Sequence, residues 1–283
     1  MRHVRAAEGL SLLVFAWLVI LAWRRSALGR ARQVRITAIG AGAIALAVFA
    51  SQALPRIVPP TVTSIARDWV PLLLLTLFYW QAGGFVTGAD ATFEGRLLKL
   101  DRRLIAPLLA WCARHPAAGV WFLTYAELAY LSYYGAMPLA IAVLYLTGCA
   151  RSVDHFWTVV LLAAYGSCAV LPFIQTRPPR AIDPEWSAPP FSGRVRAFNL
   201  RILRSGSIQA NTFPSAHVAI ATACALGLLH VGPVWIGFAF LWMAASIALG
   251  AAAGRYHYTA DAILGALTGA AAFVLGAAWN AAN

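Results

Sequence analysis

Two short stretches decide how this chain folds: residues 213–217, which read Phe-Pro-Ser-Ala-His, and residues 257–261, which read His-Tyr-Thr-Ala-Asp. Each stands where a long apolar run begins. A histidine or an aspartate at the mouth of a hydrophobic helix costs free energy unless it has a partner or a role. Together with the Arg-Pro-Pro-Arg cluster at residues 177–180, the two stretches predict a polar, phosphate-binding site at the ends of membrane helices.

The composition is that of a membrane protein. Of the 283 residues, 61% are hydrophobic and only 11% are charged, whereas a soluble domain is about half apolar and about a quarter charged. The chain has 22 basic residues against 10 acidic ones, and Lys99 is the only lysine. Because the arginines lie in short connections between apolar runs, we expect anionic membrane lipids as partners and no nucleic acid. The four cysteines are isolated, so neither a zinc site nor a disulfide framework is predicted.

Eight apolar runs are candidates for membrane spans, since about 20 residues cross a bilayer as a helix. They lie near residues 8–23, 36–54, 69–87, 119–147, 155–174, 214–230, 232–252 and 259–280. Backbone groups inside lipid must bond within their own segment, so we predict an all-α, polytopic membrane helix bundle. Two N-terminal transmembrane helices occupy residues 1–60, and a six-helix core occupies residues 61–283.

Two further segments are amphipathic. Residues 91–115 and 194–206 alternate apolar side chains with arginines, so we expect both to lie as helices in the headgroup layer.

The distribution of arginines predicts the topology. With eight spans, one side of the membrane receives five arginines and the other side receives the remaining seventeen basic residues. The five are Arg2, Arg5, Arg56, Arg67 and Arg151. The positive-inside rule places the richer side in the cytoplasm. The same count puts Arg177, Pro214 and His257 at that side, so we expect a shared site on the cytoplasmic face, in a bacterial inner membrane.

The histidines are the candidate catalytic residues. His257 and Asp261 are four residues apart and share one helix face. A carboxylate bonded to one imidazole nitrogen fixes the tautomer and leaves the other nitrogen free, so His257 is a candidate nucleophile on phosphorus. His217 is then the candidate general acid. The alternative is that these are polar helix caps with incidental histidines.

Other polar groups are candidates for binding the phosphate. A helix that begins at Pro214 leaves the amides of residues 215–217 free to bind an anion, and Ser215 adds a hydroxyl. Arg177, Arg180 and Arg255 carry guanidinium groups that match phosphate oxygens. For any one of these arginines, anchoring at the membrane interface is the alternative.

Glu127 is an acidic residue inside the fourth apolar run, about 12 Å below its nearer end. An ionisable residue at that depth is a functional candidate, and we predict that it activates an acceptor hydroxyl or carries a proton. The alternative is a protonated glutamic acid bonded to a neighbouring tyrosine.

The order Arg-Pro, then Pro-Ser-x-His, then His-x-x-x-Asp resembles that of the type 2 phosphatidic acid phosphatase superfamily, over residues 170–265. The resemblance implies a phosphohistidine mechanism that needs no metal and no cofactor. His257 attacks, Asp261 orients it and His217 acts as the acid. Arg177, Ser215 and the amide of Ala216 hold the phosphoryl oxygens, and Tyr258 is a further substrate-binding candidate.

The departures from the pattern bear on the substrate. Val170 stands where the phosphatase pattern has lysine, Ala216 where it has glycine, and Ala251 where it has arginine. The stretch at residues 257–261 and the two extra N-terminal spans are more similar to the inositol phosphorylceramide synthase and sphingomyelin synthase branch. A site that lacks two cations also matches a singly charged phosphodiester better than a monoester.

We therefore expect an enzyme that transfers or cleaves the phospho-headgroup of a phospholipid or sphingolipid. A phosphatase acting on a lipid or polyprenyl phosphate or pyrophosphate is the alternative. Two further alternatives are a lipid carrier without catalytic activity and a metal hydrolase that uses His217, His257 and Asp261.

Overall fold

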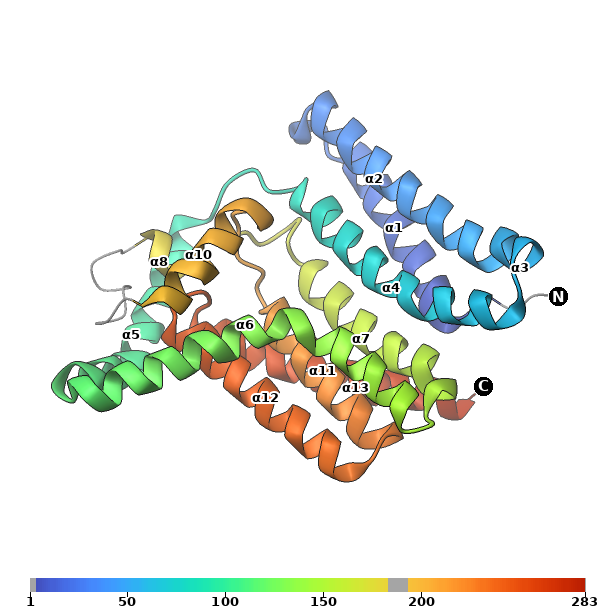
Figure 1. Ribbon diagram of the computed structural model, residues 1–283. Helices are drawn as coiled ribbons and strands as arrows, with labels where there is room; N and C mark the ends of the chain where they lie inside the picture. The colour runs from blue at the N-terminus through green and yellow to red at the C-terminus, as the bar shows by residue number, and fades with distance from the viewer. Residues whose placement is uncertain (1–3, 183–192, 283) are drawn as a thin grey trace.

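The computed structural model describes residues 4–182 and 193–282, and in this part of the chain every regular element is a helix (Figure 1). The helices are α1 (Ala6–Arg24), α2 (Arg30–Val48), α3 (Leu54–Ile57), α4 (Pro60–Gly83), α5 (Ala91–Arg114), α6 (Pro116–Leu146), α7 (Val153–Cys168), α8 (Pro179–Ile182), α10 (Arg194–Gly206), α11 (Ala216–Val231), α12 (Val234–Ala253) and α13 (Thr259–Ala282). The predicted all-α polytopic bundle is confirmed.

Six of the described helices are long and apolar enough to cross a membrane: α1, the continuous stretch Arg30–Ile57, α4, α6, α12 and α13. The predicted spans at 155–174 and 214–230 correspond to α7 and α11, which have only 16 residues each. Helix α7 ends at Cys168, and residues 169–173 form turns. Both short helices are mostly buried among the others, so neither has to match the bilayer thickness by itself.

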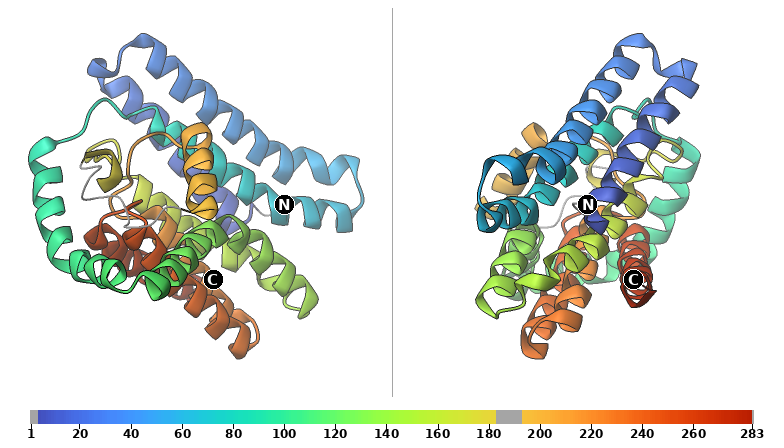
Figure 2. Two further views of the ribbon diagram at one scale, coloured as in Figure 1. Left: turned by 60° about the vertical axis from the view of Figure 1, so that its left-hand side comes forward. Right: turned by 90° about the vertical axis from the view of Figure 1, so that its right-hand side faces the viewer.

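The helices form two groups that cross (Figures 1 and 2). The pair α1 and α2 packs on α4, while α11 packs against α6, α7, α12 and α13. The amphipathic helices α5 and α10 gather with α8 at one end of the bundle. We call this the motif end, because residues 177–180, 213–217 and 257–261 lie there.

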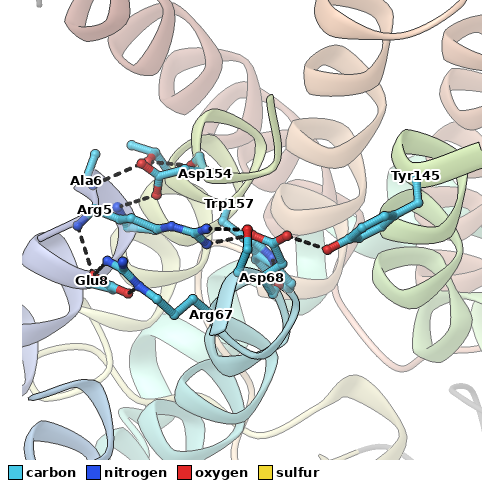
Figure 3. Close-up of polar contacts among 11 residues, drawn as sticks. Arg5, Ala6, Glu8, Arg67, Asp68, Tyr145, Asp154 and Trp157 are labelled. Atoms are coloured by element: carbon cyan, nitrogen blue, oxygen red, sulfur yellow. Dashed lines mark hydrogen bonds and ion pairs between the residues drawn. The ribbon is translucent and has the colours of Figure 1, made fainter. Parts of the chain in front are cut away.

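A network of charged side chains joins the helices at the opposite end (Figure 3). Asp68 of α4 accepts hydrogen bonds from Arg5 and from the hydroxyl of Tyr145. Arg67 pairs with Glu8 at 2.6 Å, and Asp154 of α7 accepts the first amides of α1. Because Glu8 and Asp68 are buried, each needs its cation. The starts of α1, α4 and α7 are therefore fixed together.

Two arginines beside the α1–α2 connection also hold loops at the motif end: Arg25 follows α1 directly, and Arg32 lies in the first turn of α2. The guanidinium of Arg25 donates to the carbonyl of Pro172 and lies 4.6 Å from the ring centre of Phe173. Arg32 donates to the carbonyl of Val86. The N-terminal helix pair thus contacts the core at both of its ends.

Glycines allow α13 to pack directly on the backbone of α11. A Cβ atom added at Gly265 would lie 2.6 Å from the carbonyl oxygen of Ser215, and one at Gly269 would lie 2.4 Å from that of Ala219. No side chain fits at these separations. Small residues at such spacing are typical of close helix contacts in membranes.

We expect Gly265→Ala to destabilise the protein by about 1–3 kcal/mol, because the added methyl group must push two helices apart. The matched control is Gly135→Ala on α6, where an added Cβ has no atom within 4 Å. The measurement is the apparent melting temperature of both variants in one detergent. Equal melting temperatures for the two variants would contradict this view of the contact.

Candidate active site

A cavity of about 420 Å³ lies between α4, α6, α7 and α11 and reaches the motif end. The lining at the motif end is polar and includes Arg180, Asn211, Thr212, His217 and His257. The lining toward the middle of the bundle is apolar and includes Leu72, Leu75, Met137, Ala164 and Ile220. On α4 the lining runs from Leu72 to Trp80, which is about 12 Å along the helix axis. The cavity therefore has a polar end and an apolar arm.

Four of the residues that line the cavity are exposed. Thr76 and Tyr134 lie on α4 and α6, two helices that are long and apolar enough to cross a membrane. Gly206 and Gln209 lie at the end of α10 and in the loop that follows it. The cavity therefore has exposed lining residues both on the spanning helices and at the motif end.

The structure brings together His217, His257 and Asp261 at the polar end of the cavity. The Nδ1 atom of His257 lies 3.2 Å from Oδ2 of Asp261, and its Nε2 atom lies 3.4 Å from Nδ1 of His217. Asp261 is fully buried and accepts a second hydrogen bond from the side-chain amide of Asn211. The two histidine rings are 5.4 Å apart between centroids. A small anion that enters between them would contact both.

Local sequence explains where α11 begins. The helix was expected to start at Pro214 but starts at Ala216, with Ser215 as the N-cap whose hydroxyl accepts from the amide of Val218. Serine is a preferred N-cap, whereas a helix beginning at Pro214 would have no such cap. The amide of Ala216 donates to the hydroxyl of Thr212. Ser215 is fully buried and does not line the cavity, while Ala216 does.

Two of the three candidate arginines are paired with acids on α5. Arg177 donates from its backbone and its side chain to Glu94, at 2.7 Å in each case, and does not line the cavity. Hydrogen bonding to this carboxylate raises the pKa of Arg177. Arg255 is fully buried and forms an ion pair with Asp101. The two acids are seven residues apart, so they lie on one face of α5.

Arg180 is the candidate arginine that lines the cavity. Its guanidinium lies 5.1 Å from the ring centre of Tyr256 and donates to the carbonyl oxygen of that residue at 3.4 Å. In the described part of the chain it forms no ion pair with a carboxylate. Burial lowers the pKa of Arg180, but arginine stays protonated in proteins. Arg180 therefore presents a positive charge to the cavity.

Glu127 lies near the site but does not line the cavity. It accepts hydrogen bonds from Arg196 and Asn199 of α10, each at 2.8 Å, and from the hydroxyl of Tyr256 at 2.5 Å. These contacts fix α10 on α6 and hold Tyr256 under Arg180. The catalytic role expected for Glu127 stays a prediction, as does substrate binding by Tyr258, which is fully buried outside the cavity.

Sequence reasoning did not find four residues that shape the site: Glu94, Asp101, Asn211 and Thr212. The two acids had a usable signal, because they are spaced by seven residues on the apolar face of a basic amphipathic helix. Asp101 also accepts from the amide and the hydroxyl of Thr259 at the start of α13. Asn211 and Thr212 have no comparable signal, since their roles depend on how the loop before α11 folds back.

A comparison with protein-family models gives a match to the PAP2 superfamily over residues 95–275. No curated protein and no solved structure gives a match. The matched region holds α6, α7, α11 and α12, together with His217, His257 and Asp261. With its apolar spanning helices, the chain is a multi-pass membrane protein that belongs to the PAP2 superfamily, a family with phosphatase-type activity on lipid phosphates.

Proposed function

We propose that the protein transfers or cleaves the phospho-headgroup of a membrane lipid through a phosphohistidine on His257. The observation that carries the proposal is the position of the Nε2 atom of this residue. It is the nitrogen turned away from Asp261, and it faces His217 at 3.4 Å across the polar end of a cavity with an apolar arm. The arm accommodates part of a lipid chain, and the polar end accommodates the phosphate.

The mechanism follows from the hydrogen bonds. Asp261 accepts the Nδ1 proton of His257, so Nε2 carries the lone pair that attacks phosphorus once the phosphate lies between the two histidines. As the phosphorus–nitrogen bond forms, the bond to the leaving oxygen breaks, and His217 supplies the proton to that oxygen. In the second step an acceptor alcohol or water attacks the phosphohistidine, and His217 takes back a proton.

In this proposal Arg180 holds the phosphoryl oxygens, a role for which Arg177 was the first candidate. Arg180 lines the cavity, whereas Arg177 is paired with Glu94. A fixed positive charge beside the phosphorus lowers the free energy of a transition state that carries negative charge on its oxygens.

The charges favour a phosphodiester as the substrate. A lipid phosphodiester has one negative charge, and Arg180 is the single arginine that lines the cavity among the described residues. This supports headgroup transfer or diester cleavage, as in the inositol phosphorylceramide synthase and sphingomyelin synthase branch. The second candidate, hydrolysis of a lipid or polyprenyl phosphate monoester, is favoured by the phosphatase activity of the superfamily.

For the location we propose a bacterial inner membrane, with the motif end on the cytoplasmic face. Exposed basic residues of α5 and α10, among them Arg96, Lys99, Arg103, Arg201 and Arg204, lie at that end and match anionic headgroups. In the same proposal, the pair α1 and α2 is an addition to a six-helix catalytic core.

We expect His257→Ala to lower turnover of a labelled lipid in vesicles by at least about 10³-fold, and His217→Ala to lower it by about 10²–10⁴-fold. The control is His155→Ala, at the far end of α7, where its ring lies 5.7 Å from that of His230. Lipid binding by His257→Ala should persist. Unchanged turnover in that variant would contradict the proposal, and loss of wild-type turnover in a chelator would favour a metal hydrolase instead.

The substrate class is tested with two labelled lipids of equal chain length, one a phosphodiester and one a phosphate monoester. We expect a higher kcat/KM for the diester. Arg180→Gln should lower the preferred activity by about 10²-fold or more. Arg177→Gln should retain activity but melt at a lower temperature, because Glu94 stays buried without its cation. Faster turnover of the monoester would establish the phosphatase, and full activity in Arg180→Gln would remove this arginine from the site.

A further inference from the structure

Tyr130 of α6 contacts His217 at the ring nitrogen that does not face His257. Its hydroxyl oxygen lies 3.5 Å from Nε2 of His217, while Nδ1 of the same ring lies 3.4 Å from His257. Tyr130 is 2% exposed. Within the described residues its hydroxyl has no other hydrogen-bond partner. Each nitrogen of His217 therefore has one hydrogen-bonding partner among the described residues.

The ring of Tyr130 is fixed by its contact with Tyr256. It stacks on Tyr256 with centroids 4.1 Å apart and an interplanar angle of 13°, and Tyr256 donates its hydroxyl to Glu127. Tyr130 also packs on His217 at 5.3 Å. Because Glu127 is fixed in turn by Arg196 and Asn199, the network reaches from α10 to the ring of His217.

The direction of each hydrogen bond in this series follows from the carboxylate of Asp261, with which the series ends. Asp261 accepts from Nδ1 of His257, so Nε2 of His257 carries a lone pair. A neutral His217 must then donate from Nδ1, which leaves its own Nε2 without a proton. A neutral imidazole has one donor and one acceptor nitrogen. The hydroxyl of Tyr130 is therefore the donor to Nε2 of His217.

We propose that Tyr130 is a positioning residue that holds His217 in each protonation state of the reaction. This inference rests on the proposed function. To become the acid, neutral His217 takes a proton from solvent at Nε2, and Tyr130 changes from donor to acceptor. The Nδ1 proton then moves to the leaving oxygen while the phosphorus–oxygen bond breaks and the bond to His257 forms, and Tyr130 continues to accept from Nε2. In the second step Nδ1 takes the proton of the attacking alcohol or water while the bond to His257 breaks, which restores the doubly protonated His217.

A tyrosine hydroxyl suits this task because it both donates and accepts. The other groups that face His217 do not replace it. Tyr133 and Tyr134 pack on His217 with ring centroids at 4.3 and 6.5 Å, but in the described residues neither hydroxyl forms a hydrogen bond with the imidazole. Arg180 lines the same cavity but is a donor only.

The test compares Tyr130→Phe with the wild type on two esters that differ in the leaving group. One is dodecyl phosphate, and the other is a nitrophenyl phosphate whose ring carries a dodecyl chain; both are presented as methyl diesters if the enzyme turns over diesters only. Nitrophenolate leaves without a proton, so it needs no general acid. We expect kcat/KM, which reports the steps up to release of the leaving group, to fall by about 10²-fold for the alkyl ester and by less than about threefold for the nitrophenyl ester. Equal losses on both esters would overturn the proposal.

Two further variants complete the test. Tyr165→Phe is the matched control, since this tyrosine is also buried but bonds to Ser11, away from the cavity. Any loss of activity in this control should be the same on both esters. In His217→Asn, as in Tyr130→Phe, the loss should be larger on the alkyl ester than on the nitrophenyl ester. The double variant should be no slower than His217→Asn alone. Additive losses would mean that Tyr130 acts elsewhere. If His257→Ala keeps its activity on both esters, the proposed function fails irrespective of the result for Tyr130.

Discussion

The contact between the backbones of α11 and α13 is the constraint on which the site depends. Gly265 and Gly269 leave no side chain between the helices, and the amide of Ser215 donates to the carbonyl oxygen of Asp261 at 3.0 Å. This main-chain contact sets His217, at the start of one helix, beside His257, just before the other. Their chemistry therefore depends on how closely two helices approach. A displacement of about 1 Å between them would remove much of the catalytic advantage.

The distribution of charge follows from the same packing. Buried charges in a membrane protein need partners. The buried Glu94 of α5 pairs with the exposed Arg177, and Asp101 of α5 pairs with Arg255, where both side chains are buried. These pairs fix the loops that carry the first and last motifs. Arg180, which lines the cavity, has no carboxylate partner in the described residues. Arg177 and Arg255 thus stabilise the loops around the site, whereas Arg180 is the arginine that we propose for binding the phosphate.

Several features of the molecule could be predicted from the sequence, because they depend on local patterns. The apolar runs predict the helices, and counting spans predicts that the motifs share one end of the bundle, where the structure sets two histidine rings 5.4 Å apart. Partners chosen by tertiary packing could not be predicted in this way. Arg177 meets Glu94 only because α5 docks beside it, and Ser215 caps its own helix rather than lining the cavity. The three partners of Glu127 likewise come from two separate segments, α10 and Tyr256.

In the proposed mechanism, the imidazole of His257 carries the phosphoryl group of the substrate. The most direct measurement is to stop turnover of a labelled lipid within its first cycle under alkaline denaturing conditions, which preserve a phosphoramidate bond, and to locate the label by peptide mass spectrometry. We expect label on the peptide that contains residue 257, and no label in a His257→Ala sample treated in the same way. Label on any other residue, or complete turnover with no protein-bound phosphate at any time, would contradict it.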